Sequence, residues 1–191
     1  MGAAERVREA MSAVPRKTFL PKAQRFFAPA DTPLPIGHGQ TNSQPSTVRA
    51  MLELLDVEAG DRVLDVGAGS GWTTAILARL TGPTGSVVGV ERVPELVDFG
   101  AANVEGAGMP WAHVERASPV ALGAPDRAPF DRILVSADAE VLPQELLDQL
   151  APGGVLVVPV GGRMVRAEKG PSGVEVREVG YYRFVPLVRD G

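Results

Sequence analysis

The stretch RVLDVGAGSGWTTAILARL, residues 62–80, decides the fold. It begins with a short apolar run, passes through Gly67, Gly69 and Gly71, and continues as an apolar segment of helical length. This order is typical of a strand, a tight turn and a helix in an α/β sheet, where missing side chains let a ligand approach backbone N–H groups. The spacing is G-x-G-x-G rather than G-x-G-x-x-G, which weakens a dinucleotide interpretation without removing it.

The same alternation of apolar strand and helix continues towards the C-terminus. Short apolar strands separated by helices indicate parallel strands buried on both faces. We expect strands at 62–67, 85–91, 111–116, 130–137 and 153–161, and helices at 4–13, from Pro45, and at 72–80, 94–108 and 143–151. Residues 163–188 alternate on either side of a turn at 170–173, which predicts an antiparallel hairpin at the sheet edge. The fold class is therefore a doubly wound, mostly parallel, seven-stranded Rossmann-like α/β sheet with a C-terminal hairpin.

Composition excludes several classes of protein. With 191 residues and 45% hydrophobic content, the chain is long enough for one well-packed domain. Its net charge of −4 argues against nucleic-acid binding and against a membrane surface. The absence of cysteine excludes disulfides, thiolate metal sites and a cysteine nucleophile. The N-terminus has no apolar signal region and no run is long enough to span a membrane, so we expect a cytoplasmic protein.

An acid at the end of the second predicted strand complements the glycine turn. Glu91 follows Asp65 by 26 residues, and a carboxylate in this position can accept hydrogen bonds from both hydroxyls of a ribose. The alternative is that Glu91 caps the helix that begins near Pro94, or is simply solvated. Turn and acid together favour a nucleoside-binding site.

The stretch GHGQTNSQPSTVRAMLELL, residues 37–55, combines an apparent loop rich in hydroxyl and amide groups with a helix that begins near Pro45. The hydroxyls of Thr41 and Ser43 could orient a substrate by hydrogen bonding. They could equally cap the helix that follows. The spacing alone leaves both interpretations open.

Six stretches, in the same order and at similar separations, resemble the S-adenosylmethionine-dependent protein-L-isoaspartate O-methyltransferases. They are GHGQTNSQPSTVRAMLELL, RVLDVGAGSGWTTAILARL, GVERVPELV, APFDRILVSA, LLDQLAPGGVLVVPVG and RFVPL, and the early VREAMSAVPRKTFLP also matches. The resemblance implies methyl transfer to the α-carboxyl of L-isoaspartyl residues in damaged proteins. We expect a monomer that binds neither nucleic acid, given the net charge of −4, nor metal, since no cluster of metal ligands is apparent. The resemblance further implies one methyltransferase domain, in which 1–56 form N-terminal helices and an active-site lid, 57–161 the cofactor-binding core and 162–191 the hairpin.

The resemblance also assigns roles to individual residues. Ser43 stands at the position of the active-site serine, in a loop that covers the cofactor and the damaged residue. Expected contacts to S-adenosylmethionine are Thr41, Asp65, Gly67, Ala68, Gly69, Gly71, Glu91, Arg92 and Ser118. Expected contacts to the isoaspartyl peptide are Gln40, Thr41, Ser43, Val185 and Pro186. A carboxylate is already ionised at neutral pH, so this reaction needs orientation and exclusion of water rather than a strong base.

The chain departs from the family pattern at three places. Ser118, Pro119 and Val120 stand where the family carries a Gly-Asp-Gly stretch whose acid contacts adenine, and its loss corresponds to about 1–3 kcal/mol if one hydrogen bond is unmade. Ser46 and Thr47 replace bulkier residues, and Asp138 and Glu140 would repel an anionic acceptor or be solvated. These changes keep two other hypotheses open: methylation of normal aspartate in a dedicated peptide, and a noncatalytic binding protein.

Overall fold

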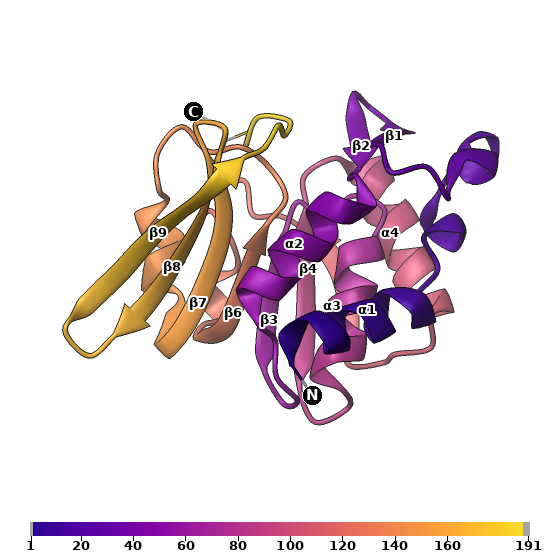
Figure 1. Ribbon diagram of the computed structural model, residues 1–191. Coiled ribbons are helices and arrows are strands. Elements are labelled where there is room, and N and C mark those ends of the chain that lie inside the picture. The colour runs from indigo at the N-terminus through magenta and orange to yellow at the C-terminus, as the bar shows by residue number, and fades with distance from the viewer. Residues whose placement is uncertain (1, 189–191) are drawn as a thin grey trace.

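A seven-stranded sheet forms the centre of the computed structural model, which describes residues 2–188 (Figure 1). Its strands lie in the order β5-β4-β3-β6-β7-β8-β9. The first five are parallel, and β8 and β9 add to β7 as antiparallel strands. The strands are β3 (Arg62–Val66), β4 (Ser86–Glu91), β5 (Ala112–Arg116), β6 (Phe130–Val135), β7 (Leu150–Val160), β8 (Arg163–Gly170) and β9 (Gly173–Tyr181), with a separate hairpin of β1 (Leu34–Gly37) and β2 (Gln40–Asn42).

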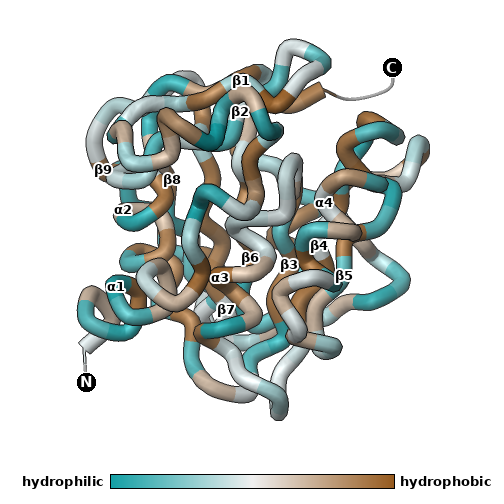
Figure 2. Tube along the Cα trace, turned by 90° about the vertical axis from the view of Figure 1, so that its right-hand side faces the viewer, coloured by the Kyte–Doolittle hydropathy of each residue, from teal (hydrophilic) through white to brown (hydrophobic). Residues whose placement is uncertain are grey.

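Helices cover the two faces of the sheet unequally. They are α1 (Ala3–Ala13), α2 (Pro45–Leu55), α3 (Trp72–Thr81), α4 (Pro94–Gly106) and α5 (Gln144–Asp148), with 3₁₀ turns η1 (Arg16–Phe19), η2 (Lys22–Phe27) and η3 (Pro125–Arg127). Side chains of α1, α2, α3 and α4 pack against one face in a cluster that includes Val63, and α5 packs against the other face in a cluster that includes Leu64. Consecutive strand residues thus serve opposite cores, which is why Val63, Leu64 and Val66 of β3 are all buried. Figure 2 shows apolar residues concentrated along these central strands.

The structure confirms the predicted fold class and corrects three boundaries. The residues 40–42, expected in a loop, form β2 and pair with β1. Helix α5 is only five residues long, and β7 begins at Leu150, because Leu150 pairs with Phe130 before an irregularity in the register. That long-range pairing overrides the local helical pattern of 143–151. No helix within residues 2–188 is long and apolar enough to cross a membrane.

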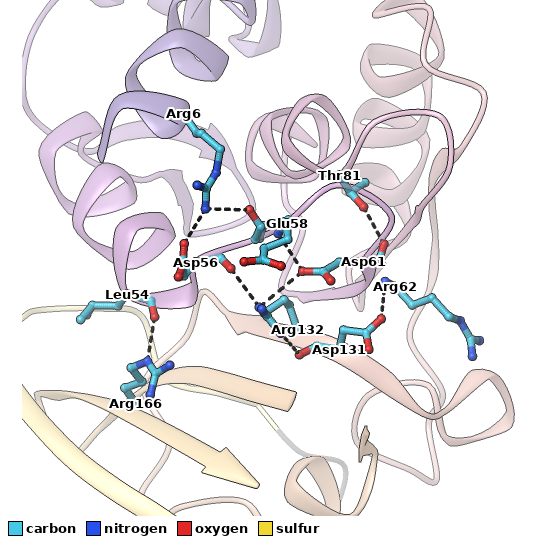
Figure 3. A network of polar contacts seen from close by, with 11 residues as sticks. Arg6, Leu54, Asp56, Glu58, Asp61, Arg62, Thr81, Asp131, Arg132 and Arg166 are labelled. Atoms are coloured by element: carbon cyan, nitrogen blue, oxygen red, sulfur yellow. Dashed lines mark hydrogen bonds and ion pairs between the residues drawn. The ribbon is translucent and has the colours of Figure 1, made fainter. Parts of the chain in front are cut away.

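Charged residues gather where the parallel strands begin, at the end of the sheet remote from their carboxyl ends (Figure 3). Arg132 Nε donates to the carbonyl of Asp56 (3.1 Å) and lies 3.4 Å from Asp61 Oδ2. Arg6 Nη2 donates to Asp56 Oδ1 (2.6 Å), which ties α1 to the end of α2. Burial raises the pKa of Asp61 despite the nearby guanidinium. These contacts fasten the N-terminal helices to β3 and β6.

Asp65 is the only acid in β3 and is completely buried. The hydroxyls of Thr73 and Thr74, in the first turn of α3, donate to its Oδ2 at 2.9 and 2.7 Å, whereas Oδ1 has no hydrogen-bond partner within the described chain. Burial raises the pKa of Asp65 to about 6, opposed by the two threonine hydrogen bonds and reinforced by the charge of Glu91. The residue fixes the start of α3 against the end of β3.

The raised pKa of Asp65 predicts a pH dependence of stability. Its carboxyl titrates near 3.9 in an unfolded chain, so ionisation opposes folding and stability is lost as pH rises from about 4 to about 6. In Asp65→Asn the amide oxygen can still accept from both threonines and nothing ionises. We expect the unfolding free energy of the variant, relative to wild type, to increase by about 2–3 kcal/mol between pH 4 and pH 7 in urea titrations. The exposed Asp98→Asn is the control, and parallel pH profiles for wild type and Asp65→Asn would contradict this assignment.

Candidate functional site

A cleft of about 1150 Å³ opens at the carboxyl ends of β3, β4 and β6. The chain winds outwards from β3 to β5 and then returns to place β6 on the other side of β3. The order of strands therefore reverses beside β3, which is where open α/β sheets bind ligands. Eleven of the residues predicted to contact cofactor or substrate line this cleft: Gln40, Thr41, Ser43, Gly67, Ala68, Gly69, Glu91, Arg92, Ser118, Val185 and Pro186.

The glycine turn offers a surface without side chains. Gly67 and Gly69 have φ values of 83° and 52°, and a Cβ on Gly69 would lie 3.2 Å from Ile36 Cδ1. The N–H groups of Gly67 and Ala68 both donate to the carbonyl of Val90, and that of Gly69 donates to Glu91. These three N–H groups are therefore engaged within the protein, although the turn itself lines the cleft. The turn permits close approach to the backbone, while its donors hold it against β4.

Asp65 and Gly71, two further residues expected at the cofactor, lie away from the lining of the cleft. Asp65 is buried beneath the turn. A Cβ on Gly71 would lie 2.8 Å from the carbonyl oxygen of Gly100 and 2.8 Å from Val104, so this glycine allows α3 to begin in contact with α4. Both residues shape the turn from behind rather than facing the cleft.

Glu91 is held by three backbone donors. Its Oε2 accepts from Gly69 N–H (2.9 Å), and its Oε1 accepts from the N–H groups of Arg92 (2.7 Å) and Val93 (3.0 Å). The carboxylate thus joins the glycine turn to the segment that leads into α4, and the alternative of a purely solvated acid does not apply because Glu91 is only 8% exposed. A carboxylate oxygen can accept more than one hydrogen bond, so capacity remains for a hydroxyl in the cleft.

Neither Thr41 nor Ser43 caps α2. The helix has Gln44 at its N-cap, the Gln44 side chain makes no capping hydrogen bond to the helix backbone, and Pro45 opens the first turn. Asp31 supplies the cap from a distance, because its Oδ1 accepts from Ser46 N–H at 2.8 Å. Hydrogen bonds from Gln44 and Ser46 lower the pKa of Asp31. The capping interpretation of the two hydroxyl residues is thereby overturned, and both line the cleft.

Sequence reasoning missed the group that holds the hairpin, namely Arg16. This arginine is 6% exposed and donates five hydrogen bonds, all to residues 30–43. Asn42, whose side chain accepts from Arg16, is 4% exposed and donates from Nδ2 to Ser70 Oγ at 3.0 Å. Arg16 lies in VREAMSAVPRKTFLP, one of the stretches that match the family, but neither its residue type nor its spacing marks it as buried.

The C-terminal wall of the cleft is formed by residues 181–188, which comprise the last residue of β9 and the segment after it. Asp138 anchors this segment: its N–H donates to the Val185 carbonyl (2.8 Å) and its carbonyl accepts from Leu187 N–H (2.7 Å). The Asp138 carboxylate accepts from Gly162 N–H at 3.1 Å. Asp138 and Glu140 do not line the cleft. The expectation that these acids would repel an anionic acceptor is therefore not supported by their positions.

The loop after β5 closes the cleft on the side of Glu91. Residues 117–123 line it with mostly apolar groups, and Ser118 Oγ accepts from Val120 N–H (3.2 Å). Gln149 fixes the end of the loop, because its side chain accepts from Ala124 N–H (2.9 Å) and donates to the Leu122 carbonyl (2.8 Å). The loop therefore places mostly apolar groups beside the Glu91 carboxylate.

The chemical groups that line the cleft suit a nucleoside and a small anionic acceptor. Charged residues of the lining are Glu91, Arg92, Glu145 and Arg183. Across residues 2–188 no group of three or more His, Asp or Glu side chains could hold a metal ion. The cleft thus provides side-chain-free backbone, one firmly held carboxylate and several hydroxyl and amide groups.

Comparisons with known proteins agree with this geometry. The family model for protein-L-isoaspartate(D-aspartate) O-methyltransferase matches residues 1–191. A protein-L-isoaspartate O-methyltransferase of Methanopyrus kandleri is 46% identical over 96% of this chain and 83% of its own length. A solved structure of a protein-L-isoaspartate O-methyltransferase superposes with a TM-score of 0.87 at 26% identity, over 98% of this chain and 62% of that one.

A second solved structure, from Plasmodium falciparum, is of a protein assigned as a protein-L-isoaspartate O-methyltransferase and contains S-adenosyl-L-homocysteine. It superposes with a TM-score of 0.84 at 27% identity, over 97% of this chain and 91% of that one. The family match extends over the whole sequence and the structural match over nearly all of it. The chain belongs to the protein-L-isoaspartate(D-aspartate) O-methyltransferase family.

Proposed function

We propose that this protein transfers a methyl group from S-adenosylmethionine to the α-carboxylate of L-isoaspartyl residues in damaged proteins, and so initiates their repair. The observation that carries the proposal is that Ser43, the glycine turn and Glu91 line one cleft at the reversal of strand order. Family membership over residues 1–191 gives the reaction class. The bound S-adenosyl-L-homocysteine of the Plasmodium relative, which is the demethylated form of the cofactor, supports the choice of methyl donor.

Residues around the turn would hold the cofactor. Glu91 would accept from the ribose hydroxyls, and Gly67 and Gly69 would allow the cofactor against the backbone. Arg92, Ala68 and Thr41 belong to the same lining, and Ser118 lies in the apolar loop where the base would stack. Ser118 Oγ accepts a hydrogen bond from Val120 N–H but keeps its own O–H donor, so the base would be recognised by shape, by backbone groups and by this hydroxyl.

Residues of the hairpin and of the C-terminal wall would hold the peptide. The Ser43 hydroxyl would donate to the acceptor carboxylate and fix its direction, with Gln40 and Thr41 beside it. Val185 and Pro186 would form the wall against which the peptide lies. A short hydrogen bond from a neutral donor orients an anion without taking its charge, which preserves its nucleophilicity.

The cofactor supplies an activated methyl group on a sulfonium. A carboxylate oxygen forms the new C–O bond while the S–CH₃ bond breaks and its electrons remain on sulfur, so positive sulfonium and negative carboxylate become a neutral thioether and a neutral ester. No proton moves, which is consistent with a cleft lined by no histidine. The chain's contribution is alignment of the two reactants and exclusion of water.

We also propose that the chain acts as a cytoplasmic monomer and one catalytic domain, with the lid in 1–56, the cofactor-binding core in 57–161 and the hairpin in 162–191. Its net charge of −4 disfavours a nucleic-acid substrate. The long-range contacts of α1 and α2 with α3, β6 and β7 support treating the N-terminal part and the core as one unit.

The decisive experiment is transfer of labelled methyl from S-adenosylmethionine to a matched pair of peptides, one isoaspartyl and one aspartyl, with cofactor affinity measured by calorimetry. We expect base-labile label on the isoaspartyl peptide alone. Equal or greater labelling of the aspartyl peptide would favour the dedicated-peptide hypothesis. Peptide binding without transfer would favour a noncatalytic binding protein and reject our proposal.

Removal of the Ser43 hydroxyl tests its role at the acceptor. Ser43→Ala should lower kcat for the isoaspartyl peptide by about tenfold to a hundredfold, because the acceptor carboxylate loses an orienting donor. The dissociation constant of S-adenosyl-L-homocysteine should stay within about twofold of wild type. Ser12→Ala, at an exposed residue of α1, is the matched control. Unchanged kcat in Ser43→Ala would remove Ser43 from the site.

Loss of the Glu91 carboxylate tests the cofactor side. Glu91→Ala should weaken S-adenosyl-L-homocysteine binding by about tenfold to a hundredfold, through lost ribose contacts and through release of the Gly69, Arg92 and Val93 N–H groups. Calorimetry gives the affinity, and circular dichroism shows whether the variant is folded. Glu95→Ala, in the first turn of α4 and exposed, serves for comparison. Equal affinities in Glu91→Ala and wild type would exclude Glu91 from the cofactor site.

A further inference from the structure

We propose that Arg16 is a positioning residue for methyl transfer: it fixes the backbone of Asn42 and Ser43 and, through Asn42, sets their distance from the glycine turn at Ser70. Arg16 does not line the cleft and would touch neither reactant. The inference rests on the proposed function for its kinetic consequences, whereas the fixation of the backbone can be tested without any reaction.

The hydrogen bonds of Arg16 converge on the residue proposed to orient the acceptor. Nε donates to Asn42 Oδ1 (2.6 Å), and Nη2 donates to the carbonyls of Asn42 (3.0 Å) and Ser43 (3.0 Å). One planar guanidinium therefore holds two successive backbone carbonyls and the side chain of Asn42. A planar fork of donors fixes direction as well as distance, which a flexible ammonium cannot do.

Two more hydrogen bonds extend this hold to the segment before the hairpin. Nη1 donates to the Ala30 carbonyl (3.0 Å) and Nη2 to the Thr32 carbonyl (2.8 Å). Residues 30–32 and 42–43 lie on either side of the β1–β2 hairpin. Arg16 therefore binds the segments at both ends of the β1–β2 hairpin, so the base of the hairpin is fixed.

Because Arg16 is buried, the loss of any of its hydrogen-bond partners would be costly in free energy. Arg16 is 6% exposed, its guanidinium carbon lies 5.6 Å from the centroid of the Trp72 ring, and within residues 2–188 no carboxylate forms an ion pair with it. Its positive charge is compensated by neutral oxygens, by an aromatic face and by the Coulombic attraction of the Asp31 carboxylate. A buried charge without its partners is costly, so these acceptors are held firmly in one arrangement.

Asn42 carries the arrangement to the cofactor side. Its Oδ1 accepts from Arg16, which leaves Nδ2 to donate to Ser70 Oγ at 3.0 Å. Ser70 is 3% exposed and follows Gly69 directly, and its carbonyl accepts from Asn103 Nδ2 of α4 at 2.9 Å. The chain of contacts Arg16–Asn42–Ser70 thus spans from the lid to the turn. The methyl donor and the acceptor carboxylate of an in-line transfer must be held at a defined separation. The contacts Arg16–Asn42–Ser70 fix that separation.

Arg16→Lys tests the proposal while keeping the positive charge. The lysine ammonium lacks the planar set of donors of the guanidinium and cannot reach the five acceptors together. The backbone of residues 41–44 should therefore be fixed less firmly. Hydrogen exchange of these amides, followed by mass spectrometry without ligand, should accelerate by about tenfold. The matched control is Arg25→Lys, an exposed arginine of η2 that donates only to the Leu20 carbonyl, and it should leave exchange at 41–44 unchanged.

Kinetics then separate positioning from simple support of the fold. At a temperature where circular dichroism shows both proteins folded, kcat for the isoaspartyl peptide should fall by about tenfold or more in Arg16→Lys, with S-adenosyl-L-homocysteine affinity within about threefold. In the double variant Arg16→Lys/Ser43→Ala, kcat should lie within about twofold of the weaker single variant, because both changes remove one oriented hydroxyl.

Two results would overturn the proposal: unchanged exchange at 41–44 in Arg16→Lys, or losses in kcat that multiply in the double variant. Ser70→Ala gives an independent measurement, since it removes the acceptor of Asn42 and leaves the bonds of Arg16 intact; it should accelerate exchange at 41–44 less than Arg16→Lys does. If wild type transfers no methyl group, the proposed function fails, and the exchange experiment alone still decides whether Arg16 fixes the lid.

Discussion

A single buried guanidinium determines how the first third of the chain meets the sheet. Arg16 can satisfy its donors only when residues 30–32 and 42–43 surround it, and the indole of Trp72 completes the enclosure. Trp72 in turn donates from Nε1 to the Val14 carbonyl at 3.0 Å, so α1, the hairpin and α3 meet at one point. Burial lowers the pKa of Arg16 to about 10, still well above neutral pH, and the group stays charged. Any displacement of the hairpin would leave that charge with unmet hydrogen bonds.

Two carboxylates on either side of the glycine turn are held in different ways. Asp65 is sealed beneath it, where burial favours its neutral form, and it serves to fix the start of α3. Glu91 stands at the cleft and is compensated by three backbone N–H groups. The turn therefore presents one firmly held acid to the cleft, and its own N–H groups are engaged with β4 and with that acid. Under our proposal, recognition at this wall would depend on its shape and on the Glu91 carboxylate, because the N–H groups of Gly67, Ala68 and Gly69 are engaged.

The elements of the α/β sheet could be predicted from the sequence because their signals are local. Strands such as 62–66 and 130–135 are short segments rich in branched apolar residues, and helices such as α2 carry an apolar stripe with Pro45 at the start. The prediction failed where distant residues decide. Leu150 joins β7 through its pairing with Phe130, and the apparent loop at 40–42 becomes a strand through its pairing with 34–37.

The same distinction between local sequence signals and contacts of distant residues applies to the candidate site. By itself the sequence determined the order of strands and helices, the glycine turn, the acid at Glu91 and the hydroxyl-rich segment at Ser43, because these depend on side-chain periodicity and on residue types at short spacing. Only the tertiary structure decided which groups face the cleft. It turned the N–H groups of Gly67 and Ala68 towards Val90, moved the cap of α2 to Asp31, and drew Arg16 into the interior. Each of these outcomes follows from hydrogen bonds between residues 13 or more positions apart, and such pairings leave no pattern in a single sequence.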